Sequence, residues 1–197
     1  MDIGIGLFGL GTVGSGVVKI LQDNADQIAK RTGTHLLVKH AVVNNLEKKR
    51  TGFINNFPIT NDAKDILNNP EIQIVVEVMG TLDQAYKIIK DSLTAKKHVV
   101  TANKDLIASR GQELVAIAEA NGVDLFFEAA VAGGIPILRT LANSFTADEI
   151  SRVAGIINGT SNFILTQMTT NKLSYANALQ LAQKKGFAEA DPTNDVA

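Results

Sequence analysis

The feature that most constrains the fold of this chain is a regular alternation of short apolar runs with longer amphipathic segments. The apolar runs cover residues 3–8, 36–43, 72–78, 98–101 and 123–127. Between them, helical periodicity is found over residues 12–30, 82–95 and 111–121. Buried strands that alternate with helices predict a parallel sheet covered on both faces. We therefore expect an α/β fold built on a doubly wound parallel sheet.

The rhythm changes after about residue 130. A helix is predicted over residues 137–145, a β-branched strand over 150–157, and two helices over 161–169 and 175–185. We interpret residues 1–130 as one domain and residues 131–197 as the beginning of a second, α+β domain. Residues 188–197 form a carboxylate-rich segment with nothing after it to pack against, so we expect a truncated chain.

Composition narrows the classes of function. The chain has 19 basic and 20 acidic residues and a net charge of −1, which argues against a nucleic-acid partner. It has no charged leader and no apolar run of membrane-spanning length, so we expect a cytoplasmic protein without a membrane partner. The absence of cysteine rules out disulfides and disfavours aldehyde dehydrogenases that need a thiol nucleophile. The three histidines show no metal-ligand spacing, and we assign them no function.

A glycine motif, GLGTVG over residues 9–14, joins the first predicted strand to the first helix. In that position Gly9 would make the tight turn, Gly11 would let the backbone approach a pyrophosphate, and Gly14 would let the helix pack on the strand. The helix N-terminus adds unpaired N–H groups and a positive dipole. A flexible glycine turn is the alternative. The context favours a Rossmann-type domain that binds a dinucleotide.

The end of the second strand indicates which dinucleotide binds. An acidic residue there would contact the adenine ribose of NAD, and a basic residue would pair with the 2′-phosphate of NADP. Here Asn44 is neutral, and Lys48, Lys49 and Arg50 follow. This favours NADP, with NAD or dual use also open, and a solvated charged turn is the alternative.

Three further segments follow strand ends, where ligands bind in open parallel sheets. Lys104 follows the fourth strand and could stabilise a developing alkoxide or move a proton, although such a lysine is commonly an ordinary surface residue. Gly80 follows the third strand and would keep the chain clear of the nicotinamide, unless it is a simple turn glycine. Glu128 precedes a small-residue loop that could hold a hard cation through carbonyl oxygens, or Glu128 is a hydrogen-bonding residue at the domain junction.

Together these segments resemble the homoserine dehydrogenase family. The resemblance is carried by residues 9–14, by HVVTANK at 98–104, by EAAVAGGIP at 128–136, and above all by GIINGTSNFIL at 155–165 with GFAEADPTND at 186–195. It extends over essentially the whole chain. It implies reversible NAD(P)H-dependent reduction of L-aspartate 4-semialdehyde to L-homoserine, on the route to threonine, methionine and isoleucine.

The resemblance also implies roles for single residues. Lys104 would lie at the nicotinamide and substrate, Glu189 would bind the amino-acid end of the substrate, and Gly186 would border the cofactor. The complete expected set has cofactor-binding residues Gly9, Gly11, Thr12, Val13, Gly14, Asn44, Gly80, Thr101, Lys104 and Gly186; substrate-binding residues Asn158, Gly159, Thr160 and Glu189; catalytic residues Lys104 and Asp195; and sodium ligands Glu128, Val131, Gly133 and Ile135.

The sequence departs from the family pattern in three places. Relatives continue with a further glycine, aspartate and lysine, the lysine being the usual candidate proton donor. They often have arginine and aspartate where this chain has Asn44 and Asn45, and Gly-Gly where it has Gly80 and Thr81. We therefore expect this chain to bind cofactor with little turnover. The resemblance itself implies that the full-length protein forms a homodimer or a larger oligomer. Another Rossmann oxidoreductase of a small amino or hydroxy acid, and a non-catalytic nucleotide-binding module, remain as alternatives.

Overall fold

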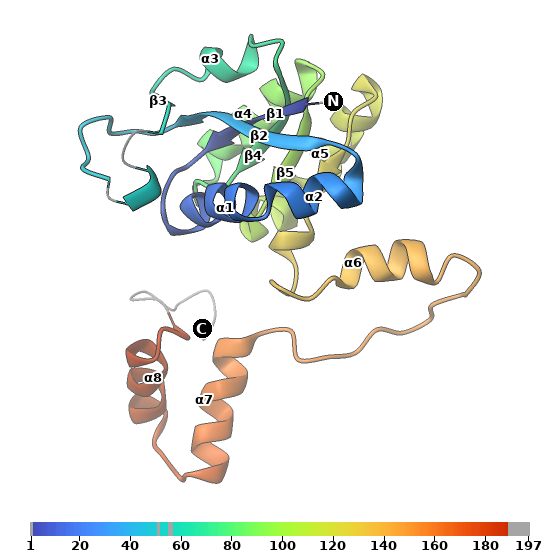
Figure 1. Cartoon of the computed structure of the whole chain (residues 1–197). Coiled ribbons are helices and arrows are strands. Elements are labelled where there is room, and N and C mark those ends of the chain that lie inside the picture. Colours follow the sequence, from blue (N-terminus) through green and yellow to red (C-terminus); the bar gives the residue numbers. More distant parts are fainter. Residues whose placement is uncertain (1, 51, 55–56, 189–197) are drawn as a thin grey trace. The chain divides into compact units, whose positions relative to one another are not determined.

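The computed structural model describes residues 2–50, 52–54 and 57–188, and it divides the chain into two compact units, Met1–Ser144 and Phe145–Ala197. The first unit is built on a parallel sheet of six strands in the order β3-β2-β1-β4-β5-β6 (Figure 1). The strands are β1 (Asp2–Phe8), β2 (His35–Val42), β3 (Ile59–Thr60), β4 (Ile72–Glu77), β5 (His98–Thr101) and β6 (Leu125–Phe126). This order is that of a Rossmann fold, so the predicted fold class is confirmed.

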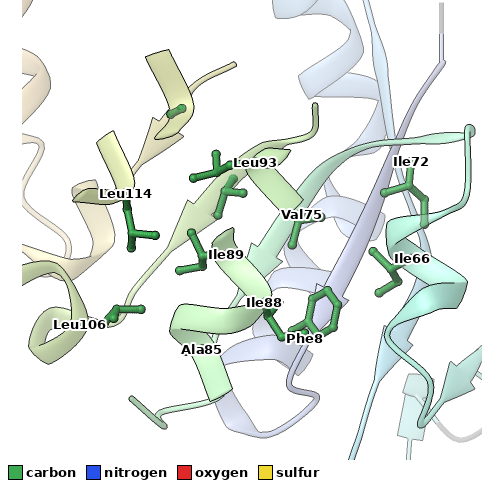
Figure 2. Close-up of a cluster of buried hydrophobic side chains, with 12 residues drawn as sticks. Phe8, Ile66, Ile72, Val75, Ala85, Ile88, Ile89, Leu93, Leu106 and Leu114 are labelled. Carbon is green, nitrogen blue, oxygen red and sulfur yellow. The ribbon is translucent and has the colours of Figure 1, made fainter. Parts of the chain in front are cut away.

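Helices cover both faces of this sheet because its strands are apolar on both sides. The helices of the first unit are α1 (Thr12–Asp23), α2 (Ala25–Thr32), α3 (Lys64–Leu67), α4 (Asp83–Thr94), α5 (Lys104–Asn121) and α6 (Ile137–Arg139), with short helical turns at Gly52–Ile54, Glu128–Ala130 and Thr140–Ser144. One core cluster joins α3, α4 and α5 to the sheet through Phe8, Ile72 and Val75 (Figure 2). A second cluster joins α1 to the other face through Val18 and Leu7. Burial on two faces is what the near-continuous apolar strands predicted.

Four central strands end level with one another. Phe8 of β1 lies opposite Val42 of β2 and Glu77 of β4, and Glu77 lies opposite Thr101 of β5. The segments that follow these residues therefore leave the sheet along a single edge. In open α/β sheets this carboxyl edge is where ligands bind.

Several element boundaries differ from the sequence-based prediction. The predicted helix 12–30 is broken at Asn24, whose φ of −113° is not helical and whose side-chain amide donates to the Ile20 carbonyl at 3.0 Å. Helix α5 begins at Lys104, seven residues before the predicted start at Gly111, because Asn103 caps it. The short elements β3 and α3 lie in a segment too polar to give a periodic signal.

In its described residues the second unit contains two helices, α7 (Gly159–Thr170) and α8 (Tyr175–Lys184), which lie side by side (Figure 1). Their buried contact is made by Ile164, Ala178 and Ala182. The predicted strand at 150–157 is wrong, since these residues form no strand in the structure. Its β-branched side chains are exposed, Val153 by 63% and Ile157 by 94%. A strand needs a hydrogen-bonded neighbour, and the described residues supply none for this segment.

The two compact units meet after Ser144, whereas the sequence predicted a domain boundary near residue 130. The boundary near residue 130 stays a prediction. In the part of the chain that the structure describes, no helix is long and apolar enough to cross a bilayer.

Lys97 is a buried cation directly before β5, and it bonds to the turn before β4 and to the first residue of β4. Its side chain is almost fully enclosed, and Nζ donates to the carbonyls of Asn69 at 2.8 Å and Ile72 at 2.6 Å. We expect Lys97→Met to lower the free energy of unfolding at pH 7 by about 1–3 kcal/mol, because both carbonyls lose a charged donor. Urea unfolding of the two proteins measures this, with the exposed Lys30→Met as the matched control. Equal midpoints for Lys97→Met and wild type would contradict it.

The buried Lys97 ammonium also makes the stability of the fold depend on pH. Desolvation by burial lowers the pKa of Lys97 in the folded chain from its ordinary value of 10.5. Between these two values the unfolded chain holds a proton that the folded chain has lost, so stability rises with pH. The stability of wild type relative to Lys97→Met should therefore increase as the pH approaches 10.5 and decrease as the pH falls through the lowered pKa. Unfolding midpoints at pH 7, 9 and 10 measure this difference, and a difference independent of pH would contradict it.

Candidate functional site

The glycine motif forms the turn between β1 and α1 at the carboxyl edge of the sheet. Gly9 has a φ of +99°, and its N–H donates to the Val42 carbonyl at 3.1 Å. A Cβ at Gly9 would lie 2.8 Å from the Val78 carbonyl oxygen, and one at Gly14 would lie 2.0 Å from the Gly9 carbonyl oxygen. No side chain fits at either position, so these two glycines hold α1 against the strands.

Gly11 differs from its two neighbours in the motif. Its φ of −89° suits any residue, and a Cβ there would have no atom within 4 Å. Thr12 and Val13 begin α1 with exposed side chains, no side chain caps the helix, and its first turn has no acidic residue. The motif therefore presents bare backbone and the N–H groups of a helix start toward open space, the geometry that suits an anionic phosphate.

The loop after β2 lies beside this turn, since Gly9 bonds to the last residue of β2. Asn44 is exposed, and the Asn45 side chain accepts the N–H groups of Glu47 at 2.9 Å and Lys48 at 3.0 Å. The Arg50 guanidinium donates to the carbonyls of Asn45 and Lys48, each at 3.0 Å. Side-chain to backbone bonds thus shape the loop, while Lys48 and Lys49 remain exposed.

Lys104 lies at the same edge as the first residue of α5, three positions after the end of β5. It is exposed, and Asn103 caps the helix by accepting the Leu106 N–H. The side chain of Asn103 also donates to the Thr81 carbonyl at 2.7 Å, next to Gly80. The structure therefore brings together the predicted residues Gly80, Thr101 and Lys104. A cation at a helix N-terminus is unfavourable for the helix dipole, which favours a functional role for the lysine.

One buried group in this region was not assigned from the sequence. Glu77, the last residue of β4, has no exposed surface, and its carboxylate accepts the Met79 N–H at 2.7 Å and the Thr101 hydroxyl at 2.7 Å. The available signal was a carboxylate at the end of an otherwise apolar run, VVEV at residues 75–78. Such a group is costly to bury without partners, so its position at the ligand edge is informative.

The loop that begins at Glu128 was predicted to hold sodium. Both carboxylate oxygens of Glu128 accept backbone N–H groups, from Leu138 at 2.9 Å and Arg139 at 2.9 Å, and the Ile135 carbonyl accepts the Ile137 N–H. The carboxylate therefore caps α6. One carboxylate with backbone carbonyls is a donor set that suits a hard cation, and each oxygen keeps a second lone pair. Within the described ranges, no group of three His, Asp or Glu side chains gathers in a way that could hold a metal ion.

A hollow of about 930 Å³ lies next to this loop in the first unit. It is lined mainly by apolar side chains, among them Phe126 and Ile135, and it contains neither the glycine motif nor Lys104. The hollow is therefore a separate feature from the glycine turn and from Lys104.

The second unit contains the expected substrate-binding residues. Asn158 caps α7 by accepting the Ser161 N–H at 2.8 Å, and Gly159 is the first residue of that helix. The buried Thr160 hydroxyl donates to the Phe187 carbonyl at 2.5 Å. Gly186, with a φ of +75°, follows α8 and precedes Phe187. The structure thus joins the start of α7 to the end of α8. The expected residues Glu189 and Asp195 lie outside the described residues.

The strand order, the glycine turn and the level strand ends define a nicotinamide-dinucleotide-binding domain of the Rossmann class. Residues 9–128 match the family described as homoserine dehydrogenase, NAD binding domain, and residues 136–197 match the homoserine dehydrogenase family. The chain belongs to the homoserine dehydrogenase family. Membership of this family does not favour the two alternatives, another Rossmann oxidoreductase or a non-catalytic nucleotide-binding module.

Known relatives give the same assignment. The chain is 50% identical to homoserine dehydrogenase of Bacillus subtilis over 98% of the present chain. It is 45% identical to homoserine dehydrogenase of Lactococcus lactis over 100% of the present chain. It covers 45% and 46% of those two proteins. A crystal structure of homoserine dehydrogenase from Thiobacillus denitrificans matches the whole chain with a TM-score of 0.93 and 46% identity, and the chain covers 45% of it. A hyperthermophilic archaeal homoserine dehydrogenase in complex with NADPH matches with a TM-score of 0.83 and 26% identity over 100% of this chain and 65% of that one. The chain thus spans about half the length of the curated relatives that it matches.

Proposed function

We propose that this chain binds NAD(P)H at the carboxyl edge of its sheet and serves the reversible reduction of L-aspartate 4-semialdehyde to L-homoserine. The observation that carries the proposal is the glycine turn, in which Gly9 and Gly14 admit no side chain while Gly11 faces open space at the start of α1. Membership of the homoserine dehydrogenase family supports the substrate. The reaction would serve the synthesis of threonine, methionine and isoleucine.

Different residues would bind the cofactor, stabilise the reacting oxygen and bind the substrate. The backbone of residues 9–14 would hold the pyrophosphate, with the dipole of α1 favouring its charge. A nicotinamide held there would supply a hydride for the aldehyde carbon, and the carbonyl oxygen would take its proton from water or from a neighbouring acid to give the alcohol. Lys104 would place its ammonium near that oxygen and stabilise the developing negative charge. Asn158, Gly159, Thr160 and Glu189 would bind the amino-acid part of the substrate.

Several finer features belong to the same proposal. The loop at residues 128–135 would hold a sodium ion through Glu128 and the carbonyls of Val131, Gly133 and Ile135, consistent with its oxygen donors. Asp195 and Lys104 would form the catalytic group. The family resemblance supports a cytoplasmic protein that, at its full length, forms a homodimer or a larger oligomer.

Cofactor preference follows from the loop after β2. No acidic side chain occupies residues 43–46, and Lys48 and Lys49 are exposed where a 2′-phosphate could pair with them. We expect NADPH to bind about fivefold more tightly than NADH at low ionic strength, since one solvent-exposed ion pair with a phosphate contributes about 1 kcal/mol. The difference should shrink as salt is added.

A fluorescence titration of the 197-residue chain with each cofactor tests both parts. Binding of NADPH or NADH supports the dinucleotide site, and tighter binding of NADPH supports the preference. Tighter binding of NADH would overturn the preference alone. Failure of both cofactors to bind would overturn the proposed function.

A further inference from the structure

Four hydrogen bonds, closed into a ring by the main chain, link two loops at the carboxyl edge of the sheet. Glu77 accepts the Met79 N–H and the Thr101 hydroxyl. Thr101 in turn accepts the Asn103 N–H at 3.1 Å, and the Asn103 side chain donates to the Thr81 carbonyl. The ring therefore runs from the end of β4 through the loop 79–81 to the loop 101–103 and back. Gly80 lies inside the first loop, and Lys104 follows the second directly.

The direction of each hydrogen bond in the ring is fixed. The Glu77 carboxylate has only acceptors, so the Thr101 hydroxyl must give it its single proton. That leaves the Thr101 oxygen to accept from the Asn103 N–H. Aligned bonds reinforce one another where water is excluded, as at the buried bond between Glu77 and Thr101. Reversing one of them would leave a buried donor without an acceptor.

Burial makes the carboxylate an unusual choice for a purely structural position. Glu77 and Thr101 both have no exposed surface, and among the described residues no ion pair to Glu77 is found. An apolar pair would join two neighbouring strands without the cost of burying a charge. Unlike an apolar pair, the Glu77 carboxylate and the Thr101 hydroxyl make directed hydrogen bonds, which fix the positions of the loops where β4 and β5 end.

We propose that Glu77 is a positioning residue that, through Thr101 and Asn103, sets the place of Lys104 and of the loop at Gly80 for hydride transfer. The inference rests on the proposed function. It predicts that Glu77 acts on the turnover step more than on cofactor affinity or on folding, because misplacing a catalytic group by about 1 Å costs about 10²-fold in rate.

The test compares Glu77→Gln, Thr101→Val and the double variant in the natural protein at its full length. Glutamine keeps the shape of Glu77 but adds an N–H donor, which would face either the Met79 N–H or the Thr101 hydroxyl. Thr101→Val removes the hydroxyl at nearly constant volume, and it serves if Glu77→Gln does not fold. The matched control is Ser92→Ala, a buried hydroxyl in α4 that donates to the Ile88 carbonyl outside the ring.

We expect each ring variant to lower kcat about 10²-fold while the Kd for NADPH changes by less than about tenfold. The kcat of the double variant should be no lower than that of the slower single variant, because each substitution alone already disrupts the hydrogen bond between Glu77 and Thr101. Hydrogen exchange at the Met79 and Asn103 amides should become faster in Glu77→Gln, and Ser92→Ala should keep wild-type kcat.

Three outcomes would overturn the inference. The first is kcat unchanged in both ring variants. The second is a loss of kcat matched by an equal loss of NADPH affinity or of folded protein, which indicates a structural role. The third is a wild-type protein that binds NADPH but does not oxidise homoserine, which overturns the proposed substrate and the inference together. An active wild type with active ring variants overturns the inference alone.

Discussion

Replacement of Gly11 by valine is expected to abolish most dinucleotide binding while leaving the fold intact. The backbone at Gly11 suits an L-residue, and its side chain would point into open space. That space is where a pyrophosphate would approach the N–H groups of α1. We expect the Kd for NADPH to rise by about 100-fold or more, equivalent to about 3 kcal/mol. Fluorescence titration measures the affinity, and circular dichroism with urea unfolding measures the fold.

The motif and its helix supply the controls for this experiment. Gly16 also faces open space but lies in the second turn of α1, so Gly16→Ala should keep NADPH affinity and raise stability by about 0.5–1 kcal/mol. Gly14→Ala should damage folding itself, because its Cβ would clash with the Gly9 carbonyl. Unchanged NADPH affinity in a folded Gly11→Val protein would remove the foundation of the proposed function.

Replacement of Lys104 by methionine is expected to lower kcat about 10²- to 10⁴-fold in the full-length protein, with NADPH affinity largely kept. An ammonium near the reacting carbonyl stabilises negative charge that develops only in the transition state, so its loss affects turnover more than binding. Methionine keeps most of the aliphatic stem and removes the charge. Steady-state kinetics of homoserine oxidation with NADP gives kcat, and an NADPH titration gives the affinity.

Lys64→Met is the matched control, because Lys64 is likewise an exposed lysine at the first position of a helix. Its helix follows the edge strand β3, which is separated from β5 by three strands of the sheet. We expect wild-type kcat in this variant. If Lys104→Met also kept wild-type kcat, Lys104 would be an ordinary surface residue and the proposed chemistry would need another group.

Much of the first unit could be predicted because its elements have strong local signals. The strand at residues 98–101 was predicted with the bounds that the structure has, since an apolar β-branched run between two polar segments allows few other structures. Elements without apolar periodicity were missed, as with β3 and α3. The segment 150–157 shows the opposite failure. Its residues favour a strand, but a strand also requires a neighbour, which no local pattern reports.

The site shows the same division between local and tertiary information. The glycine motif could be placed from sequence because its function requires a fixed order of strand, turn and helix. The capping role of Glu128 could not, because its partners at Leu138 and Arg139 become neighbours only when the loop folds back. The ring at Glu77 depends on strand register, which brings Glu77 opposite Thr101 across 24 positions of sequence. The residues of the ring could be read from the sequence, but the hydrogen bonds between them could not.

The loop after β2 has a practical consequence for protein engineering. Because the Asn45 and Arg50 side chains bond to the backbone of the same loop, the shape of residues 45–50 depends little on the rest of the molecule. The neighbouring turn has no such freedom, as any side chain at Gly9 or Gly14 collides with main-chain atoms. If the proposed NADPH preference resides in this loop, replacing residues 45–50 should change the preferred coenzyme without altering the glycine turn.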